Sequence, residues 1–204
     1  MTDYITEQEY LDYAKSGADP GNQVIIDAIA AASRQVEGFC GRPFDQTSLT
    51  LYYTPGMYAS FVDIDDLATA TGLSVHVDTS RDSTYATALT LGTDYVLEPR
   101  NQQFGGIAGW PFMQLRGLRV LVFPYRYYPW QVDTVKVTGT FGWPAVPAPV
   151  KQATKIIVAQ LIKLAEAPLG VAGWGAFGDI RVRDIPQAAT LLGPYMKGDS
   201  FGIA

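Results

Sequence analysis

Residues 138–166 read TGTFGWPAVPAPVKQATKIIVAQLIKLAE, and this stretch decides the fold. We expect a strand that ends at Phe141, a rigid Gly-Trp-Pro corner, and a long helix from about Ala148 to Glu166. Pro147 and Pro149 stand near the helix start, where the missing N–H of proline costs little. Apolar residues recur at spacings of three and four and extend beyond one narrow stripe, which predicts burial on more than one side. One side can pack on the chain's own sheet, and the other on a second helix or a neighbouring copy.

The composition bounds the size and the kind of protein. With 204 residues, 48% of them hydrophobic, the chain can bury the core of one domain with an extension or of two small domains. The formal net charge is −5 with only 15 Lys and Arg, and no basic stripe typical of nucleic-acid binding is present. The single Cys excludes an internal disulfide and favours a cytosolic compartment. The N-terminus does not read as a signal peptide, and Lys155 and Lys163 make the long helix a poor membrane span.

Along the chain, helix signals stand at both ends and strand signals stand between them. The pattern Thr6 to Glu9 is a capping box that opens a short helix over residues 7–15. A second helix is expected over 22–39, closed by Gly38 and Gly41. Turn signals then separate short alternating runs that predict strands at 48–54, 60–65, 73–78, 94–98, 118–123 and 132–141. Residues 79–87 are expected to form a loop or a hairpin tip, and 101–117 show no clear period. Residues 179–184 alternate as an extended segment, 186–196 predict a short helix, and 197–204 a frayed tail.

These elements predict an α+β fold. Two long helices and the short terminal helices form a helical bundle core, residues 1–47 and 142–204, with an extended C-terminal arm over about 168–204. An antiparallel β subdomain, residues 48–141, is inserted between the two long helices.

The search for catalytic chemistry finds no convincing site. Residues 173–178 read GWGAFG, but a helix precedes them and an extended segment follows, which is the wrong context for a phosphate loop. Cys40 and His76 are the only Cys and His; we expect a core thiol and a sheet-surface imidazole rather than a catalytic pair or a zinc site. Asp63, Asp65 and Asp66 are expected to form a solvated strand end, not a calcium loop.

Three segments are candidates for contacts with a partner. Trp174 and Phe177, on the Gly-rich segment, either tuck onto the chain's own core or insert into a partner. Residues 180–183, Ile-Arg-Val-Arg, read as a charged edge strand that either protects the monomer or pairs with a neighbour. The aromatic cluster within 125–130 is either a packed hairpin tip or a contact site, with sugar stacking as one option; it comprises Tyr125, Tyr127, Tyr128 and Trp130.

The order of several short segments resembles that of head–tail connector proteins of tailed phages, also called head completion or adaptor proteins. The segments that carry the resemblance are 28–44, 91–95, 137–153, 168–183 and 191–195. The middle of the chain, 60–130, departs from the compact helical members and is similar to the inserted β subdomain of forms from actinobacteriophages.

The resemblance implies a structural protein of the virion neck, assembled in the host cytoplasm, with no catalytic residue, metal, cofactor or membrane contact. It implies a homo-oligomeric ring of twelve copies under the portal protein, with a stopper or tail terminator on the other face and double-stranded DNA in the lumen. The arm would contact the portal or the next subunit through Trp174, Phe177, Ile180, Arg181, Val182, Arg183 and Tyr195. Packing between subunits is expected on the long helices at Ile29, Val36, Ile157 and Leu161.

An acidic lumen would repel the DNA phosphates and let the duplex slide. The rival hypothesis is a β-rich binding module of a virion, for carbohydrate or protein, that uses the aromatic cluster.

Overall fold

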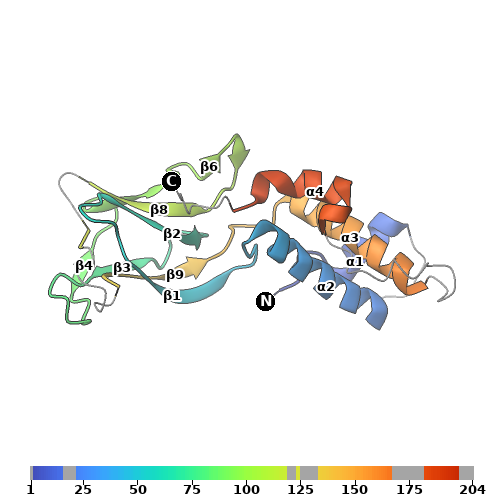
Figure 1. Ribbon diagram of the computed structural model, residues 1–204, viewed down its shortest axis with the longest axis horizontal. Coiled ribbons are helices and arrows are strands. Elements are labelled where there is room, and N and C mark those ends of the chain that lie inside the picture. The colour runs from blue at the N-terminus through green and yellow to red at the C-terminus, as the bar shows by residue number, and fades with distance from the viewer. Residues whose placement is uncertain (1, 16–21, 119–122, 125–132, 167–181, 198–204) are drawn as a thin grey trace. The chain divides into compact units, whose positions relative to one another are not determined.

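The computed structural model describes residues 2–15, 22–118, 123–124, 133–166 and 182–197. The chain divides into two compact units: a helical unit made of Met1–Asp45 and Val146–Ala204, and a β unit made of Gln46–Ala145. Figure 1 shows the helices in one unit and the strands in the other. The expected α+β fold class, with a β subdomain inserted between helices, is therefore confirmed.

The helical unit is built around its C-terminal long helix. Its helices are α1 (Glu7–Ala14), α2 (Gln23–Cys40), α3 (Ala148–Glu166) and α4 (Pro186–Leu192), with 3₁₀ turns at Val182–Asp184 and Gly193–Tyr195. α3 packs against α1, α2 and α4. Its side chains at Val150, Ala153, Ile157 and Val158 have 0% exposure. Helices of the same chain therefore cover the wide apolar surface of α3.

The ends of these helices follow from local sequence. The Thr6 hydroxyl accepts a hydrogen bond from the N–H of Glu9, and the Glu9 carboxylate accepts one from the N–H of Thr6, which completes the expected capping box. Asn22 caps α2 through the N–H of Val24. Gly41 ends α2 with φ 66°, a left-handed conformation that glycine adopts at little cost.

The β unit is a curled antiparallel sheet whose centre is β9 (Val135–Phe141). The other main strands are β1 (Thr47–Tyr53), β2 (Phe61–Leu67), β3 (Ser74–Val77), β4 (Thr87–Leu89), β5 (Tyr95–Glu98) and β8 (Phe112–Gly117). β9 pairs along its whole length with β1 on one side. On its other side it pairs with β3 and then, at Phe141, with Leu67 of β2, which continues through β8 to β5.

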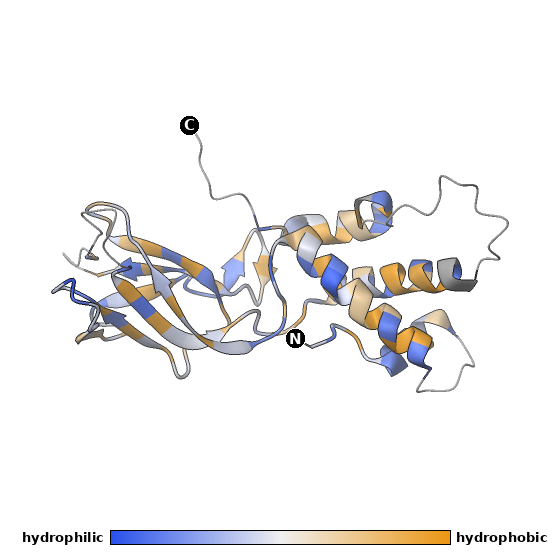
Figure 2. Ribbon diagram, turned by 60° about the horizontal axis from the view of Figure 1, so that its bottom comes forward, coloured by the Kyte–Doolittle hydropathy of each residue, from blue (hydrophilic) through white to orange (hydrophobic). Residues whose placement is uncertain are grey.

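The two halves of this sheet share one core, because side chains from β2, β5 and β8 pack with those from β3 and β9. Figure 2 shows blue and orange residues in alternation along the strands, as expected where one face of each strand is buried. Gly139 lies in β9 where a Cβ atom would stand 3.0 Å from Leu67 Cδ1 and 3.3 Å from Leu73 Cδ1. The missing side chain lets these leucines pack directly on the strand.

The chain enters and leaves the β unit at one place. Thr47, the first residue of β1, pairs with Phe141, the last residue of β9. The Gln46 side-chain amide donates to the carbonyl oxygens of Trp143 and Pro144, at 3.0 and 2.8 Å. These bonds join the segment that begins the β unit to the segment that ends it.

Several strands differ from the sequence prediction. The strand expected at 118–123 falls mainly on residues 119–122, which lie outside the described residues, and it stays a prediction. The structure adds the strand β8, which begins right after Pro111 in the segment that shows no clear period. A two-stranded hairpin, β6 (Gln103–Phe104) and β7 (Ile107–Ala108), was not predicted, nor was β4. In the hairpin, Gly105 and Gly106 form the turn with φ of 56° and 82°.

The extended segment expected at 179–184 is wrong over its described part. Val182–Asp184 form a 3₁₀ turn, in which the N–H of Ile185 donates to the carbonyl of Val182. This turn leads directly into α4, which has Pro186 at its start. Among the described helices, none has the length and hydropathy needed to cross a membrane.

Candidate interaction surfaces

The residues expected on the C-terminal arm separate into two groups. Trp174, Phe177, Ile180 and Arg181 lie outside the described residues, as does the side chain of Arg183.

The other two residues of the expected arm, Val182 and Tyr195, are each only 4% exposed and belong to the core of the helical unit. The Tyr195 ring stands edge-on to Phe44, with 6.3 Å between ring centroids. The helices of their own unit already cover both side chains, and their assignment to an interface stays a prediction.

The residues expected to pack between subunits are also mostly internal. Ile29, Val36 and Ile157 are 3%, 0% and 0% exposed within a single chain, so they have no surface to offer to another copy. Their expected role between subunits stays a prediction. Leu161 is half-buried on α3. The aromatic cluster Tyr125, Tyr127, Tyr128 and Trp130 lies outside the described residues.

The two candidate nucleophile and base residues belong to different units. Cys40 is 1% exposed, and burial raises the pKa of its thiol to about 12, so the thiol stays protonated and unreactive at neutral pH. His76 lies in β3, half-buried, with Nδ1 3.1 Å from the carbonyl oxygen of Tyr85. The expected core thiol is confirmed, and the imidazole stands against the Tyr85 backbone rather than free on the sheet surface.

The acidic cluster of β2 is only partly solvated. Asp63 and Asp65 are exposed, whereas Asp66 is 6% exposed and accepts a hydrogen bond of 3.1 Å from Trp143 Nε1. Trp143 in turn packs edge-on against Trp110, with 4.8 Å between ring centroids. The expectation of a solvated Asp66 was wrong, since a tryptophan distant in sequence covers it. Over the described ranges, no group of three or more His, Cys, Asp or Glu could hold a metal ion.

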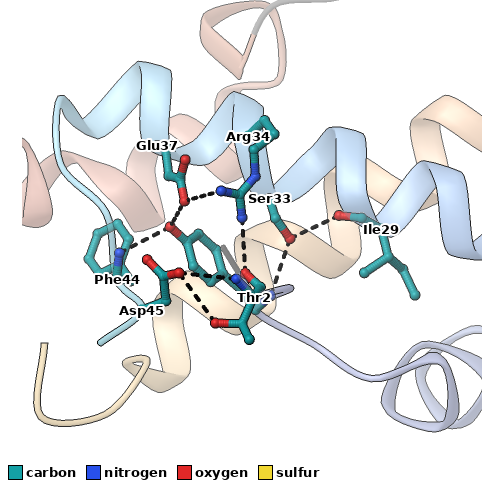
Figure 3. A network of polar contacts seen from close by, with 8 residues as sticks. Thr2, Ile29, Ser33, Arg34, Glu37, Phe44 and Asp45 are labelled. Carbon is teal, nitrogen blue, oxygen red and sulfur yellow. Dashed lines mark hydrogen bonds and ion pairs between the residues drawn. The ribbon is translucent and has the colours of Figure 1, made fainter. Parts of the chain in front are cut away.

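Sequence reasoning did not find the polar network that fixes the N-terminal segment on α2 (Figure 3). The Tyr4 hydroxyl donates to Glu37 Oε1 at 2.5 Å and accepts from the N–H of Phe44 at 3.0 Å. Burial, followed by the bond to the Glu37 carboxylate, raises the pKa of Tyr4, so the hydroxyl remains a donor. The N–H of Tyr4 donates to Ser33 Oγ at 3.2 Å. The only sequence signal was one tyrosine four residues from the N-terminus, which is too little to predict this arrangement.

Arg34 completes this network from α2. Its Nη2 donates to the carbonyl of Thr2 at 2.9 Å, and its guanidinium carbon lies 5.7 Å from the Tyr4 ring centroid. Its Nη1 stands 2.7 Å from Glu37 Oε1 as an ion pair, although the angle is not that of a hydrogen bond. We call this network the clasp, because it holds the N-terminal segment on α2 and each polar group in it orients its neighbour. It comprises Thr2, Tyr4, Ser33, Arg34, Glu37 and Phe44.

The outer face of the sheet carries an aromatic and cationic cluster. The rings of Tyr52 and Tyr85 lie 5.4 Å apart, and the Lys136 ammonium stands 5.9 Å from the Tyr85 ring centroid. The Tyr85 hydroxyl donates to the carbonyl of Asp133 at 2.7 Å, which fixes this ring on the sheet. The register of β1 with β9 sets Tyr52 opposite Lys136, and Tyr85 reaches them from the loop between β3 and β4, so no local sequence pattern could show this cluster.

The chain matches no protein-family model, and a search of curated proteins finds no match. Solved structures do share its fold. A chain from the neck of an empty GTA particle computed with C6 symmetry has a TM-score of 0.55 and 15% identity, over 98% of this chain and 92% of that chain. A chain from the neck of a native GTA particle computed with C12 symmetry has a TM-score of 0.54 and 15% identity, over 99% and 98%. A chain from the virion of a native gene transfer agent particle has a TM-score of 0.56 and 15% identity, over 98% and 92%. At this identity the likeness shows a common fold.

Proposed function

We propose that this chain is a structural, non-catalytic component of the neck of a tailed-phage-like particle, where it joins the head to the tail. The observation that carries the proposal is the extent of the fold likeness. It covers 99% of this chain and 98% of a chain from the neck of a gene transfer agent particle, so it includes both the helical unit and the inserted β unit. If the two chains shared only the helical unit or only the β unit, the other unit would have no counterpart in the match.

The finer role is that of an adaptor ring under the portal. Twelve copies fit the C12 symmetry with which that neck was computed. The formal charge of −5 per copy suits a DNA channel, because an acidic wall repels the phosphates and lets the duplex pass without binding. A stopper or tail terminator would then dock on the opposite face, within a virion assembled in the host cytoplasm.

The portal contact is assigned to the arm between α3 and the 3₁₀ turn, including Trp174, Phe177, Ile180 and Arg181. Residues 182–197 cannot be part of a removable arm, because Val182, Ala188 and Leu192 lie in the helical core with 4%, 0% and 0% exposure. A truncation from residue 170 onward would therefore unfold the unit. The informative variant is instead the double substitution Trp174→Ser with Phe177→Ser, which leaves α4 in place.

The test is the molar mass of the full chain in solution, measured by light scattering alone and after mixing with purified portal rings from tailed phages. One copy is 22.2 kDa, so a twelve-copy ring has a mass of about 270 kDa. We expect this mass, free or on the portal, and a closed ring in electron micrographs. The double variant should dock on the portal less than the wild type. A chain that stays at the monomer mass with every portal would reject the adaptor role and favour the β-rich binding module.

A further inference from the structure

One exposed stretch of the β unit carries no charge. Residues 46–62 read QTSLTLYYTPGMYASFV and contain no Asp, Glu, Lys or Arg. The chain as a whole is 17% charged, so a stretch of this length should carry about three such residues. It comprises β1, the loop that follows, and the start of β2.

The same stretch exposes large apolar side chains. Leu49 is 42% exposed, Tyr52 48%, Met57 65%, Tyr58 71% and Phe61 44%. These are five of the eleven exposed large hydrophobic residues in the described part of the chain. Aromatic residues and methionine without charges are the composition of the buried centre of a protein–protein interface.

The backbone of β1 is available in the same place. Within the described residues, β1 pairs with β9 alone and its seven-residue register runs without a bulge. It contains neither proline nor charge, which are the usual means of protecting an edge. The other edges are short: β4 has three residues, and β5 has four and is followed by Pro99. Among the described strands, β1 is therefore the long unprotected edge of this sheet.

We infer that residues 46–62 bind a second copy of this chain, with β1 adding its free edge to a strand of the neighbouring copy. Charge decides between a second copy and another kind of partner. Each copy carries a formal charge of −5, so two copies repel each other. This electrostatic repulsion is smallest where both of the contacting surfaces are neutral. A cationic partner would be bound better by an acidic surface than by this one.

This inference rests on the proposed function and deepens it, because it names the subunit contact of the ring. In a ring each contact is heterologous, so β1 meets a different surface of the next copy. A pairing of β1 with β1 would instead close a two-fold dimer. Backbone pairing supplies the affinity, while Leu49, Met57 and Tyr58 supply the apolar contact.

The decisive variant is Leu49→Lys. Leu49 lies on the core side of β1, opposite Gly139, and its 42% exposure lets a lysine reach water in the isolated chain. An added strand would cover that lysine and bury its charge. Leu91→Lys is the matched control, since Leu91 is also 42% exposed and lies outside the neutral stretch. Met57→Lys, at the 65% exposed loop position, repeats the test where a charge cannot disturb the core.

Self-association of the full chain is measured by sedimentation velocity over a concentration series, with thermal unfolding as the check of folding. We expect Leu49→Lys and Met57→Lys to weaken association by at least about tenfold and Leu91→Lys to leave it unchanged. Hydrogen exchange tests the backbone pairing directly. Amides of Thr47–Tyr53 that face away from β9 should exchange fast in the monomer and become protected in the assembled wild type.

The outcomes separate this inference from the proposed function. Closed rings that form equally from wild type and Leu49→Lys, with unprotected β1 amides, overturn the inference and leave the neck role standing. A wild type that stops at a dimer, broken by Leu49→Lys, supports the pairing and counts against the ring. A wild type that is monomeric when free, and that forms rings on the portal no better than Leu49→Lys does, overturns the inference and leaves the neck role standing.

Discussion

Tyr4→Phe removes one hydroxyl from the clasp that holds the N-terminal segment on α2. Tyr4 is 2% exposed, and its hydroxyl makes two hydrogen bonds, to the Glu37 carboxylate at 2.5 Å and from the Phe44 N–H at 3.0 Å. Phenylalanine keeps the ring and its edge-to-face contact with Phe44, whose centroid is 5.6 Å away. The change therefore isolates the polar part of the interaction.

The expected cost follows from what each partner loses. The Phe44 N–H loses the Tyr4 hydroxyl as an acceptor in a buried place, and such a loss costs about 1–3 kcal/mol. The bond to an ionised carboxylate contributes about 1.5–3 kcal/mol, but Glu37 recovers part of this because Arg34 and water remain beside it. Since the two losses share one hydroxyl and do not add fully, we expect a decrease of about 2–4 kcal/mol in the free energy of unfolding.

The assay is denaturant unfolding followed by two signals. Circular dichroism of the helices reports mainly on the helical unit, whereas three of the four tryptophans, Trp110, Trp130 and Trp143, lie in the β unit and dominate the fluorescence. The helical transition should move to lower denaturant, with a smaller change in the fluorescence transition. The control is Tyr13→Phe, because Tyr13 is 40% exposed on α1; its cost should be below about 0.5 kcal/mol.

A cost for Tyr4→Phe below about 1 kcal/mol, or one equal to that of Tyr13→Phe, would refute this reasoning. It would mean that water or a shifted backbone satisfies the Phe44 N–H in the variant. A cost carried wholly by the fluorescence transition would contradict the assignment of the clasp to the helical unit.

Three further predictions rest on titrating groups. Burial raises the pKa of the Cys40 thiol to about 12, so a thiol reagent at pH 8 should react with the chain only after unfolding. Burial also raises the pKa of Tyr95 to about 12, whereas a tyrosine in the unfolded chain has a pKa of about 10. The contribution of the neutral Tyr95 to the free energy of unfolding is therefore complete below about pH 10 and should be lost as the pH rises towards 12. Tyrosinate absorbance will follow this ionisation. The hydrogen bond from Lys151 lowers the pKa of Glu9 below its value in the unfolded chain. The ionised Glu9 therefore stabilises the fold above that unfolded value, and this stabilisation is lost as the pH falls through the lowered pKa. Because this pair is 38% and 34% exposed, Lys151→Ala should cost less than about 1 kcal/mol in denaturant unfolding at pH 7.

Local sequence signals predicted the helices well. The bounds of α3, Ala148–Glu166, are those that the proline-rich start and the apolar spacing indicate. The capping box at Thr6 and the glycine end of α2 are confirmed, because each depends only on residues within one turn of the helix end. The inserted β unit was also visible as a run of short alternating segments between turns.

The strands were predicted less well because their stability comes from partners far away in the chain. β4 has three residues, too few to show a period of two. β8 follows a glycine- and aromatic-rich segment and is fixed by pairing with β2 and β5 rather than by its own pattern.

Burial of single side chains was the least predictable feature of the candidate surfaces. Tyr195 follows a glycine-rich segment and could equally be an anchor for a partner or part of the core; only its contact with Phe44 decides. Asp66 looked solvated because its partner, Trp143, stands 77 residues further along.

The Gln46 hydrogen bonds hold the beginning and the end of the β unit next to each other, so the unit is a continuous insertion that can be exchanged as one block. A single continuous block of codons specifies it, and the two junctions of that block meet in the folded protein. Recombination between related genes can therefore replace the block, or remove it with one short turn in its place, while the helices keep the contacts among themselves. The same junction marks where an engineer could install a reporter or a different β domain, and where an alignment of related chains should show its largest change in length.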